Sequence, residues 1–368
     1  MRFKFNMPVS LKFGSGVIKE NSEDFNLGKK ALLVTGRNSA RLSGALDEIL
    51  YVLKAQDISY EIFDKVENNP SLDNIADGTA FGKECGADFV VAVGGGSPLD
   101  AAKAIAALST NKIEPIDLFK NKFNNPFLPI IAVPTTSGTG SEVTPYSVLT
   151  VPSMKTKKSF VSQWSFPKIA FADPRYTYSL PYSVTVDTAY DAFSHLLESY
   201  YSLRSNPLND SIALEGIKAF AACMDNIAAG SITKDVREKL MYASCLGGIA
   251  ISHTGTTLMH AMGYSLTYFK GFSHGRANAM IMAEYIRLNS SELPEKTEVV
   301  MKAIKLNSLE DADVYFSLGL NKKPDIDDEE CRTYAKLAMG QGSVKLNPRT
   351  VSENDIYNLY RKIFGGTQ

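Results

Sequence analysis

The stretch Phe89-Val-Val-Ala-Val-Gly-Gly-Gly-Ser-Pro-Leu-Asp-Ala-Ala-Lys103 decides the fold of this chain. Its apolar, β-branched start predicts a buried strand, and the proline after the glycines suits the first turn of a helix. The glycines let the backbone approach a ligand closely, and the helix turns unpaired N–H groups and a positive dipole end toward them. The order strand, glycine turn and helix predicts either an anion-binding turn or a tight connection that binds nothing.

Strand-like and helix-like segments alternate on both sides of this stretch, up to about residue 175. Short apolar runs predict strands over residues 31–35, 60–64, 89–93, 129–133, 158–163 and 169–172. Helical periodicity covers residues 39–54, 71–85 and 98–108. Strands that alternate with helices of this length predict an α/β fold with a doubly wound, mostly parallel sheet. The alternating residues 3–13 predict a hairpin at the N-terminus.

After residue 174 the pattern changes to helical periodicity with almost no strand signal. Helices are predicted over residues 188–202, 209–228, 236–252, 258–268 and 355–364. A chain of 368 residues is long enough for two domains. We therefore predict an α/β domain over residues 1–178 and an all-helical domain over residues 179–368.

Charge and composition exclude several classes of partner. The net charge of −1 gives no basic field, so neither nucleic acid nor an anionic membrane is an expected partner. No apolar run is long enough to span a membrane, and the N-terminus lacks the apolar core of a signal peptide. The four cysteines are widely spread, which is typical of reduced thiols. We therefore expect a cytoplasmic protein.

The chain has only four histidines, and their placement indicates a metal site. His195 follows Asp191 by four residues, so both side chains lie on one face of a helix and can reach one ion. His260 and His274 would complete a set of three nitrogens and one oxygen. This set suits Fe or Zn rather than Ca or Mg. The spacing alone leaves the metal site a hypothesis.

A second loop rich in hydroxyls and glycines, Pro134-Thr-Thr-Ser-Gly-Thr-Gly-Ser-Glu142, also follows a predicted strand. Its groups suit phosphates and sugars, although a Ser/Thr-rich turn without a ligand is the structural alternative. Two such loops at the carboxyl ends of strands of one parallel sheet predict a crevice for a dinucleotide. Neither the G-x-G-x-x-G pattern nor a P-loop is present in the glycine turn at residues 94–97.

Together these residues resemble the iron-containing (group III) alcohol dehydrogenase family, almost from end to end. The resemblance is carried by residues 94–103, residues 134–142, Asp191-x-x-x-His195, and His260 with His274-Gly275. It implies a Rossmann-like N-terminal domain and an all-helical C-terminal domain, the architecture of dehydroquinate synthase.

The resemblance also implies roles for individual residues. It assigns a divalent metal, Fe²⁺ in this family with Zn²⁺ accepting the same ligands, to Asp191, His195, His260 and His274. It assigns the nicotinamide cofactor, whose carboxamide Asp100 would face, to Gly94, Gly95, Gly96, Ser97, Asp100, Thr135, Thr136, Ser141 and Lys158. The metal would act as a Lewis acid on an alcohol or aldehyde oxygen while hydride moves to or from the nicotinamide.

The chain departs from the family at Tyr264. Family members often carry a second histidine there, four residues after the ligand that matches His260. A phenol, with an ordinary pKa near ~10, donates a hydrogen bond but is a poor base at neutral pH. We therefore expect no histidine proton relay, and Tyr264 is left to relay a proton, shape the pocket or pack. The remaining histidine, His253, either lines the cleft or has a structural role.

The cofactor preference follows from the end of the strand predicted over residues 31–35. This strand ends in Gly36-Arg37-Asn38-Ser39. In related dehydrogenases an acidic residue there binds the adenosine ribose and repels a 2′-phosphate. Glycine leaves room for that phosphate and arginine suits it. We expect NADP(H) to be preferred over NAD(H); a solvated surface role for Arg37 is the alternative.

These expectations combine into one function with two alternatives. The chain is predicted to be a metal-dependent NADP(H) alcohol dehydrogenase or aldehyde reductase for a small primary alcohol or aldehyde. The alternatives are a metal- and NAD-dependent lyase like 3-dehydroquinate synthase, and an inactive relative that binds nucleotide or metal. The edge-strand pattern at the N-terminus and the family's habit predict a homodimer or a higher homo-oligomer.

Overall fold

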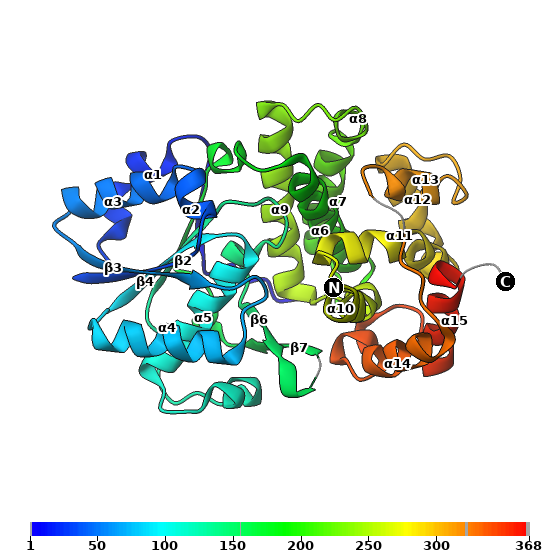
Figure 1. Ribbon diagram of the computed structural model, residues 1–368. Coiled ribbons are helices and arrows are strands. Elements are labelled where there is room, and N and C mark those ends of the chain that lie inside the picture. The colour runs from blue at the N-terminus through cyan, green and yellow to red at the C-terminus, as the bar shows by residue number, and fades with distance from the viewer. Residues whose placement is uncertain (1, 155, 321–322, 366–368) are drawn as a thin grey trace. The chain divides into compact units, whose positions relative to one another are not determined.

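The computed structural model describes residues 2–154, 156–320 and 323–365 (Figure 1). These residues form two compact units. One spans Asn6–Leu180, and the other contains the described residues from Pro181 onward together with residues 2–5.

The first unit is built on a six-stranded parallel sheet with the strand order β1-β8-β5-β4-β2-β3. Its strands are β1 (Ser10–Phe13), β2 (Lys30–Gly36), β3 (Ser59–Val66), β4 (Phe89–Gly94), β5 (Ile130–Pro134) and β8 (Ile169–Ala172). Every residue of β4 is buried, because β4 lies between β2 and β5 and helices cover both faces of the sheet. The predicted doubly wound parallel sheet is confirmed.

Alternate residues of the strands enter two separate cores, one on each face of the sheet. Val90 and Ala92 pack in one core and Val91 and Val93 in the other. The first core also contains residues of α4 (Leu72–Glu84) and α5 (Gly96–Thr110). The second contains residues of α1 (Val17–Glu20), α2 (Ser39–Leu42) and α3 (Ala45–Ala55).

Three local predictions in this unit are corrected by the structure. The N-terminal hairpin over residues 3–13 was a wrong prediction, because β1 pairs in parallel with β8 instead of with a preceding strand. The helix predicted over residues 39–54 is interrupted before α3 by Gly44, whose φ of 79° is left-handed. The strand predicted near residue 158 is β7 (Thr156–Val161), which pairs antiparallel with β6 (Tyr146–Val151) outside the main sheet.

The second unit is helical. Its helices are α6 (Tyr182–Tyr201), α7 (Pro207–Ala221), α8 (Met224–Ala228), α9 (Lys234–Thr254), α10 (Leu258–Lys270), α11 (His274–Ser290), α12 (Pro294–Ala303), α13 (Ala312–Ser317), α14 (Asp328–Met339) and α15 (Glu353–Phe364). Among the described residues no strand follows Ala172, so the all-helical prediction is confirmed. The helices α11 to α14 were not predicted from the sequence, and α11 carries the predicted ligand His274.

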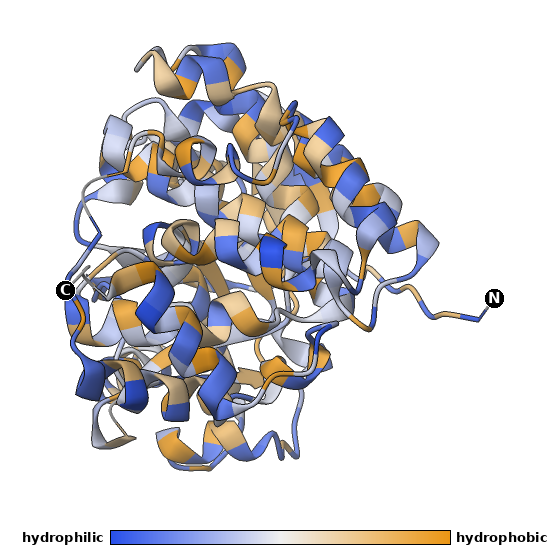
Figure 2. Ribbon diagram, turned by 90° about the vertical axis from the view of Figure 1, so that its right-hand side faces the viewer, coloured by the Kyte–Doolittle hydropathy of each residue, from blue (hydrophilic) through white to orange (hydrophobic). Residues whose placement is uncertain are grey.

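Hydrophilic and hydrophobic residues lie side by side along these helices (Figure 2). This is the pattern of helices that bury one face in a core. In the parts of the chain that the structure describes, no helix has the length and apolar character needed to cross a membrane. None of the four cysteines, which all lie in the described ranges, forms a disulfide.

Candidate metal centre and nucleotide-binding loops

The helix α6 brings Asp191 and His195 one turn apart into the interior of the helical unit. Asp191 is 3% exposed and His195 6% exposed. His260, in the first turn of α10, joins them, so that one potential ligand atom from each of the three lies within 4.8 Å of the others. The structure thus brings together three of the four predicted metal ligands.

His274, the fourth predicted ligand, lies beside this group. It is the first residue of α11, and its ring centroid is 4.9 Å from that of His260. It does not belong to the group of mutually close ligand atoms. The ring of Tyr264 stacks on the ring of His274, with a centroid distance of 5.2 Å and an interplanar angle of 14°. The tyrosine therefore packs directly against a predicted ligand.

Gly275 is what allows α11 to approach α6 so closely. A Cβ at this position would lie 1.8 Å from the carbonyl oxygen of Asp187 and 2.8 Å from the backbone nitrogen of Asp191. Both are backbone atoms, so no side-chain movement could make room. The lack of a side chain at Gly275 thus allows the start of α11 to lie against the turn of α6 that carries Asp191.

The chemistry of the group fits a divalent ion. Asp191 Oδ1 is buried and has no hydrogen-bond partner among the residues described. A buried carboxylate oxygen without a partner is costly, and a cation bound by this oxygen and by imidazole nitrogens would satisfy it. Carboxylate and imidazole ligands suit Fe²⁺ or Zn²⁺.

Glu198, which was not predicted as a site residue, lies next to His260. Its side chain is fully buried and contacts His260 Nδ1. Burial would raise the pKa of Glu198, but the charge and hydrogen bonds of His260 outweigh it and leave the pKa lowered. Burial would likewise lower the pKa of His260, and Glu198 leaves it raised. The signal was present, because Asp191, His195 and Glu198 follow an i, i+4, i+7 spacing on one helix face.

His253 lies apart from this group and has structural partners. Its ring stacks on Phe5 with a centroid distance of 4.1 Å and an interplanar angle of 4°. Its Nδ1 lies 2.8 Å from the carbonyl oxygen of Ile249. These contacts favour the structural interpretation of His253, and they tie the N-terminal residues to the helical unit.

The two loops predicted to bind the cofactor meet in the α/β unit. Their strands β4 and β5 are neighbours, with Gly94 opposite Pro134. A Cβ on Gly96 would lie 2.6 Å from Thr139 Cγ2, and one on Gly95 3.2 Å from Thr136. The helix α5 begins at Gly96, so its unpaired N–H groups face this junction. Thr135 Oγ1 is buried there and has no hydrogen-bond partner within the described ranges.

Asp100 and Ser141 are bonded to each other. Ser141 Oγ donates to Asp100 Oδ1 at 2.6 Å, and the Val148 N–H donates to Asp100 Oδ2 at 3.0 Å. Lys103, a residue without an assigned role in the sequence analysis, is 1% exposed. Its ammonium donates to Ser141 Oγ and to the carbonyl oxygen of Tyr146, both at 2.7 Å. This buried network ties α5 to the hydroxyl-rich loop.

Lys103→Met should destabilise the protein by about 1–3 kcal/mol, because it leaves the Tyr146 carbonyl oxygen and Ser141 Oγ without their buried donor and removes the cation beside the half-buried Asp100. Burial lowers the pKa of Lys103 from 10.5 to about 8. At pH values between about 8 and 10.5, Lys103 is protonated in the unfolded chain but not in the folded protein. The contribution of Lys103 to the free energy of unfolding therefore rises with pH. Urea unfolding of the native protein and of Lys103→Met measures the difference between their free energies of unfolding. This difference should therefore be larger near pH 10.5 than near pH 8. A difference that narrows would contradict the buried position of Lys103.

The remaining predicted cofactor residues are spread over three places. Ser97 Oγ accepts a hydrogen bond from the Asn69 N–H at 3.1 Å. The ammonium of Lys158 lies 5.7 Å from the ring centroid of Phe119. The neighbouring Lys157 instead donates to Asn69 Oδ1 at 2.6 Å, so Lys157 is the lysine that reaches the surroundings of the glycine turn.

At the end of β2, Arg37 and Asn38 are exposed, and Ser39 is half-buried. A Cβ on Gly36 would meet its nearest neighbours at 3.8 Å, an ordinary van der Waals distance. The end of this strand can thus accept a Cβ atom without a clash.

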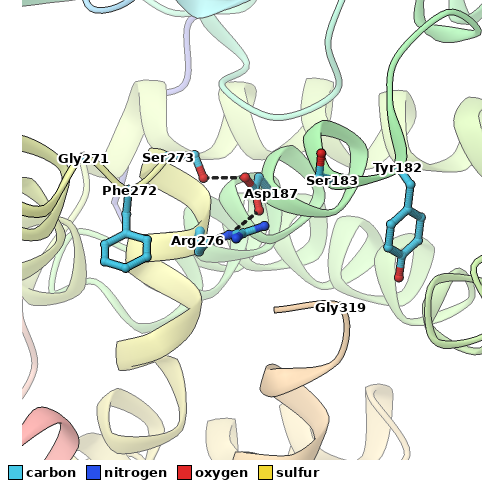
Figure 3. Close-up of a pocket in the computed structure, with 8 residues that line it drawn as sticks. All are labelled: Tyr182, Ser183, Asp187, Gly271, Phe272, Ser273, Arg276 and Gly319. Atoms are coloured by element: carbon cyan, nitrogen blue, oxygen red, sulfur yellow. Dashed lines mark hydrogen bonds and ion pairs between the residues drawn. The ribbon is translucent and has the colours of Figure 1, made fainter. Parts of the chain in front are cut away.

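A pocket of about 470 Å³ opens in the helical unit (Figure 3). Ser273 and Arg276 both point to the carboxylate of Asp187: Ser273 Oγ donates to it at 2.6 Å and Arg276 Nε at 2.9 Å. The pocket is lined by Tyr182, Ser183, Asp187, Gly271, Phe272, Ser273, Arg276 and Gly319. Its lining reaches to one residue from His274 and one helical turn from Asp191.

Comparison with known proteins agrees with this geometry. The family model "Iron-containing alcohol dehydrogenase" matches residues 8–174, and the model of the family's C-terminal domain matches residues 185–364. A 1,3-propanediol dehydrogenase of Klebsiella pneumoniae is 32% identical over 98% of this chain and 99% of its own length. An NADPH-dependent butanol dehydrogenase of Clostridium saccharobutylicum is 29% identical over 99% of each.

Solved structures support the same assignment. The crystal structure of an iron-containing alcohol dehydrogenase from Thermotoga maritima superposes with a TM-score of 0.92. The two chains are 38% identical, and the match covers 99% of this chain and 100% of the other. The protein described here therefore belongs to the iron-containing alcohol dehydrogenase family and is an oxidoreductase.

Proposed function

We propose that the protein is an NADP(H)-dependent aldehyde reductase that requires a divalent metal, and that also oxidises the corresponding small primary alcohol. The observation that carries this proposal is the buried group of Asp191, His195 and His260, which holds potential ligand atoms within 4.8 Å of one another. Together with His274, whose ring lies beside that of His260, this group would provide the three nitrogens and one oxygen that suit Fe²⁺, with Zn²⁺ as the alternative ion.

Each unit would contribute one part of the chemistry. Residues 179–368 would hold the metal and the substrate, and residues 1–178 would bind the dinucleotide. When bound, the metal supplies a Lewis acid for the alcohol or aldehyde oxygen. The glycine turn at residues 94–97 and the start of α5 would hold the pyrophosphate, with Thr135, Thr136 and Ser141 on the facing loop. Asp100 would orient the nicotinamide carboxamide, and Lys158 remains a weaker candidate because its ammonium lies over Phe119.

Tyr264 has no basic nitrogen, so it is a poorer base at neutral pH than a histidine would be. Its stacking on His274 favours a role in which the ring holds that ligand in place. The phenol would then shape the pocket next to the reacting oxygen. Proton exchange with solvent would proceed without a side-chain base at this position.

The decisive experiment is anaerobic turnover of butyraldehyde by the purified protein, with NADPH and NADH in parallel. The assay is run as purified, after chelation, and after Fe²⁺ or Zn²⁺ is added back. We expect NADPH oxidation that disappears on chelation and returns with metal. A lyase of the 3-dehydroquinate synthase type would show no net NADPH consumption, because it regenerates its cofactor in each turnover. No oxidation with either cofactor across several aldehydes would count against the proposal.

Gly36→Asp should shift the cofactor preference toward NADH by about 10- to 100-fold in the ratio of kcat/KM values. A carboxylate at the end of β2 can bind the ribose of NADH and repels a 2′-phosphate, and one charged hydrogen bond is worth about 1.5–3 kcal/mol. A Cβ at Gly36 would meet no atom closer than 3.8 Å. Kinetics with both cofactors measure the ratio, and Gly342→Asp, whose Cβ would meet no atom within 4 Å, controls for the added charge. An unchanged ratio would remove Arg37, Asn38 and Ser39 from the phosphate site.

We also propose a cytoplasmic homodimer or higher homo-oligomer. The strand β1 is one edge of the six-stranded sheet, and an exposed edge offers unpaired backbone groups to a second chain. Light scattering of the purified protein measures the mass directly, and a mass of one chain at micromolar concentration would contradict the oligomer.

A further inference from the structure

We propose that Glu198 is a positioning residue for the metal site. It holds the His260 ring in the tautomer that carries its proton on Nδ1, so that Nε2 is the nitrogen offered to the metal. The inference rests on the proposed function, since it concerns the ligand role of His260. It adds to the site a buried residue that takes part without touching the metal or the substrate.

The tautomer follows from the group that contacts Nδ1 of the ring. A carboxylate can only accept hydrogen bonds, and Glu198 Oε2 contacts His260 Nδ1, so Nδ1 must carry the proton. On the other side, the amide nitrogen Nδ2 of Asn278 lies 3.3 Å from His260 Nε2. An amide NH₂ group is a donor, so this contact is compatible with Nε2 as the acceptor. The carboxylate of Glu198 therefore selects the tautomer, which leaves the lone pair on Nε2.

The position of Glu198 is fixed by a second set of contacts at the start of α10. Glu198 Oε1 accepts from the His260 N–H at 3.2 Å and from Thr257 Oγ1 at 2.8 Å. Thr257 is the N-cap of α10 but makes no capping bond with its own side chain. Glu198 therefore provides, from α6, the acceptor that the first turn of α10 lacks, and its charge suits a helix N-terminus. One carboxylate thus orients both the backbone and the ring of His260.

Burial makes this arrangement specific. Glu198 is 0% exposed and His260 2% exposed. A buried carboxylate is tolerated only where hydrogen bonds satisfy both of its oxygens. The contacts to Thr257 and to His260 do so, and the Thr257 hydroxyl in turn lies 2.8 Å from Tyr285 OH. Ring rotation of His260 would leave an oxygen of Glu198 without its partner, so the ring is held in one orientation.

A purely structural role for Glu198, capping α10 and no more, makes a different prediction for Glu198→Gln. Glutamine keeps the size and one oxygen, which can still accept from the start of α10. Its NH₂ group then faces His260 Nδ1 and requires that nitrogen to be an acceptor, which moves the proton to Nε2 and blocks the nitrogen that would bind the metal. A residue that only caps the helix would leave the ring and its metal affinity unchanged.

The test uses the whole chain with ¹⁵N-labelled histidine, first free of metal and above neutral pH. Four histidines give few enough ring signals to assign, with His260→Gln identifying the signal of His260. We expect the Nδ1–H tautomer at His260 in the native protein and a shift to Nε2–H in Glu198→Gln. Zn²⁺ affinity, measured by competition with a chelator, should fall about 10- to 100-fold in Glu198→Gln. An Nε2–H tautomer in the native protein, or native Zn²⁺ affinity in the variant, would overturn the proposal.

Glu284→Gln is the matched control. Glu284 is a half-buried carboxylate of the same unit, ten residues beyond His274 on α11, and pairs with Arg287. The substitution Glu284→Gln should leave both the tautomer of His260 and the Zn²⁺ affinity unchanged. If the native chain binds neither Zn²⁺ nor Fe²⁺, the proposed function fails, while the tautomer of His260 still tests the hold of Glu198 on the ring. If Glu198→Gln does not fold, the tautomer in the native protein decides alone.

Discussion

His260→Ala should lower metal affinity by more than ~100-fold and aldehyde turnover by about 10³-fold or more. The loss in affinity should exceed the ~10- to 100-fold that removal of a supporting hydrogen bond costs, because one of three converging ligand atoms disappears. The loss in turnover follows because Lewis-acid polarisation supplies several kcal/mol of the rate enhancement. Metal content per chain and chelator competition measure the first effect, and NADPH oxidation the second.

The same substitution should also reduce stability, since it leaves the buried Glu198 without the group that pairs with it. Breaking such a pair from one side costs about 3–5 kcal/mol. His253→Ala is the matched control, because His253 is a histidine of the same unit whose ring stacks on Phe5. It should retain the native metal content. A metal content in His260→Ala equal to that of the native protein would remove His260 from the ligand set.

Gly275→Ala should destabilise the helical unit by about 3 kcal/mol or more and abolish tight metal binding. The added Cβ would lie 1.8 Å from the Asp187 carbonyl oxygen, a distance that only a backbone displacement can relieve, and such overpacking costs typically 1–3 kcal/mol and sometimes more. The displacement would separate the start of α11, with His274, from the turn of α6 that carries Asp191. Thermal unfolding with and without Zn²⁺ measures both effects.

The control for this prediction is Gly342→Ala, since a Cβ at Gly342 would meet no atom within 4 Å. It should change stability by no more than about 0.5 kcal/mol. A Gly275→Ala variant that unfolds at the same temperature as the native protein and is stabilised by Zn²⁺ to the same extent would show that the close approach of α11 and α6 is not needed for the site.

The predictions that failed share a physical cause. The alternating residues 3–13 carry the period of a strand, but alternation does not reveal the partner, and β1 pairs with β8 from far along the chain. Similarly, residues 39–54 keep a helical period through Gly44, where only the backbone geometry reveals the break between α2 and α3. The helix α11 was not predicted because its apolar residues show no single stripe. They show none because α11 is buried on several sides.

For the site, local spacing predicted only which residues of a single helix lie on the same face. Asp191 and His195 could be paired from an i, i+4 interval, and the two phosphate-type loops from their glycines and their position after strands. Spacing also placed Glu198 on the face of Asp191 and His195, but it could not reveal the contact with His260 on α10. It likewise placed Lys103 one turn from Asp100, but not near Ser141 and Tyr146 on other segments. The proximity of His260 to Glu198, or of Lys103 to Tyr146, is created by packing.

The amino-acid sequence was sufficient to predict the parallel sheet, the helical second half, the glycine turn before α5 and the family. These features depend on periodicity, on glycine's backbone freedom and on residue types at short spacing, all of which are local properties. Only the folded chain shows which imidazoles lie near Asp191, how closely α11 approaches α6 at Gly275, and which nitrogen of His260 contacts Glu198. Those depend on distances between helices and on the hydrogen bonds of buried groups, which exist only after the chain has folded.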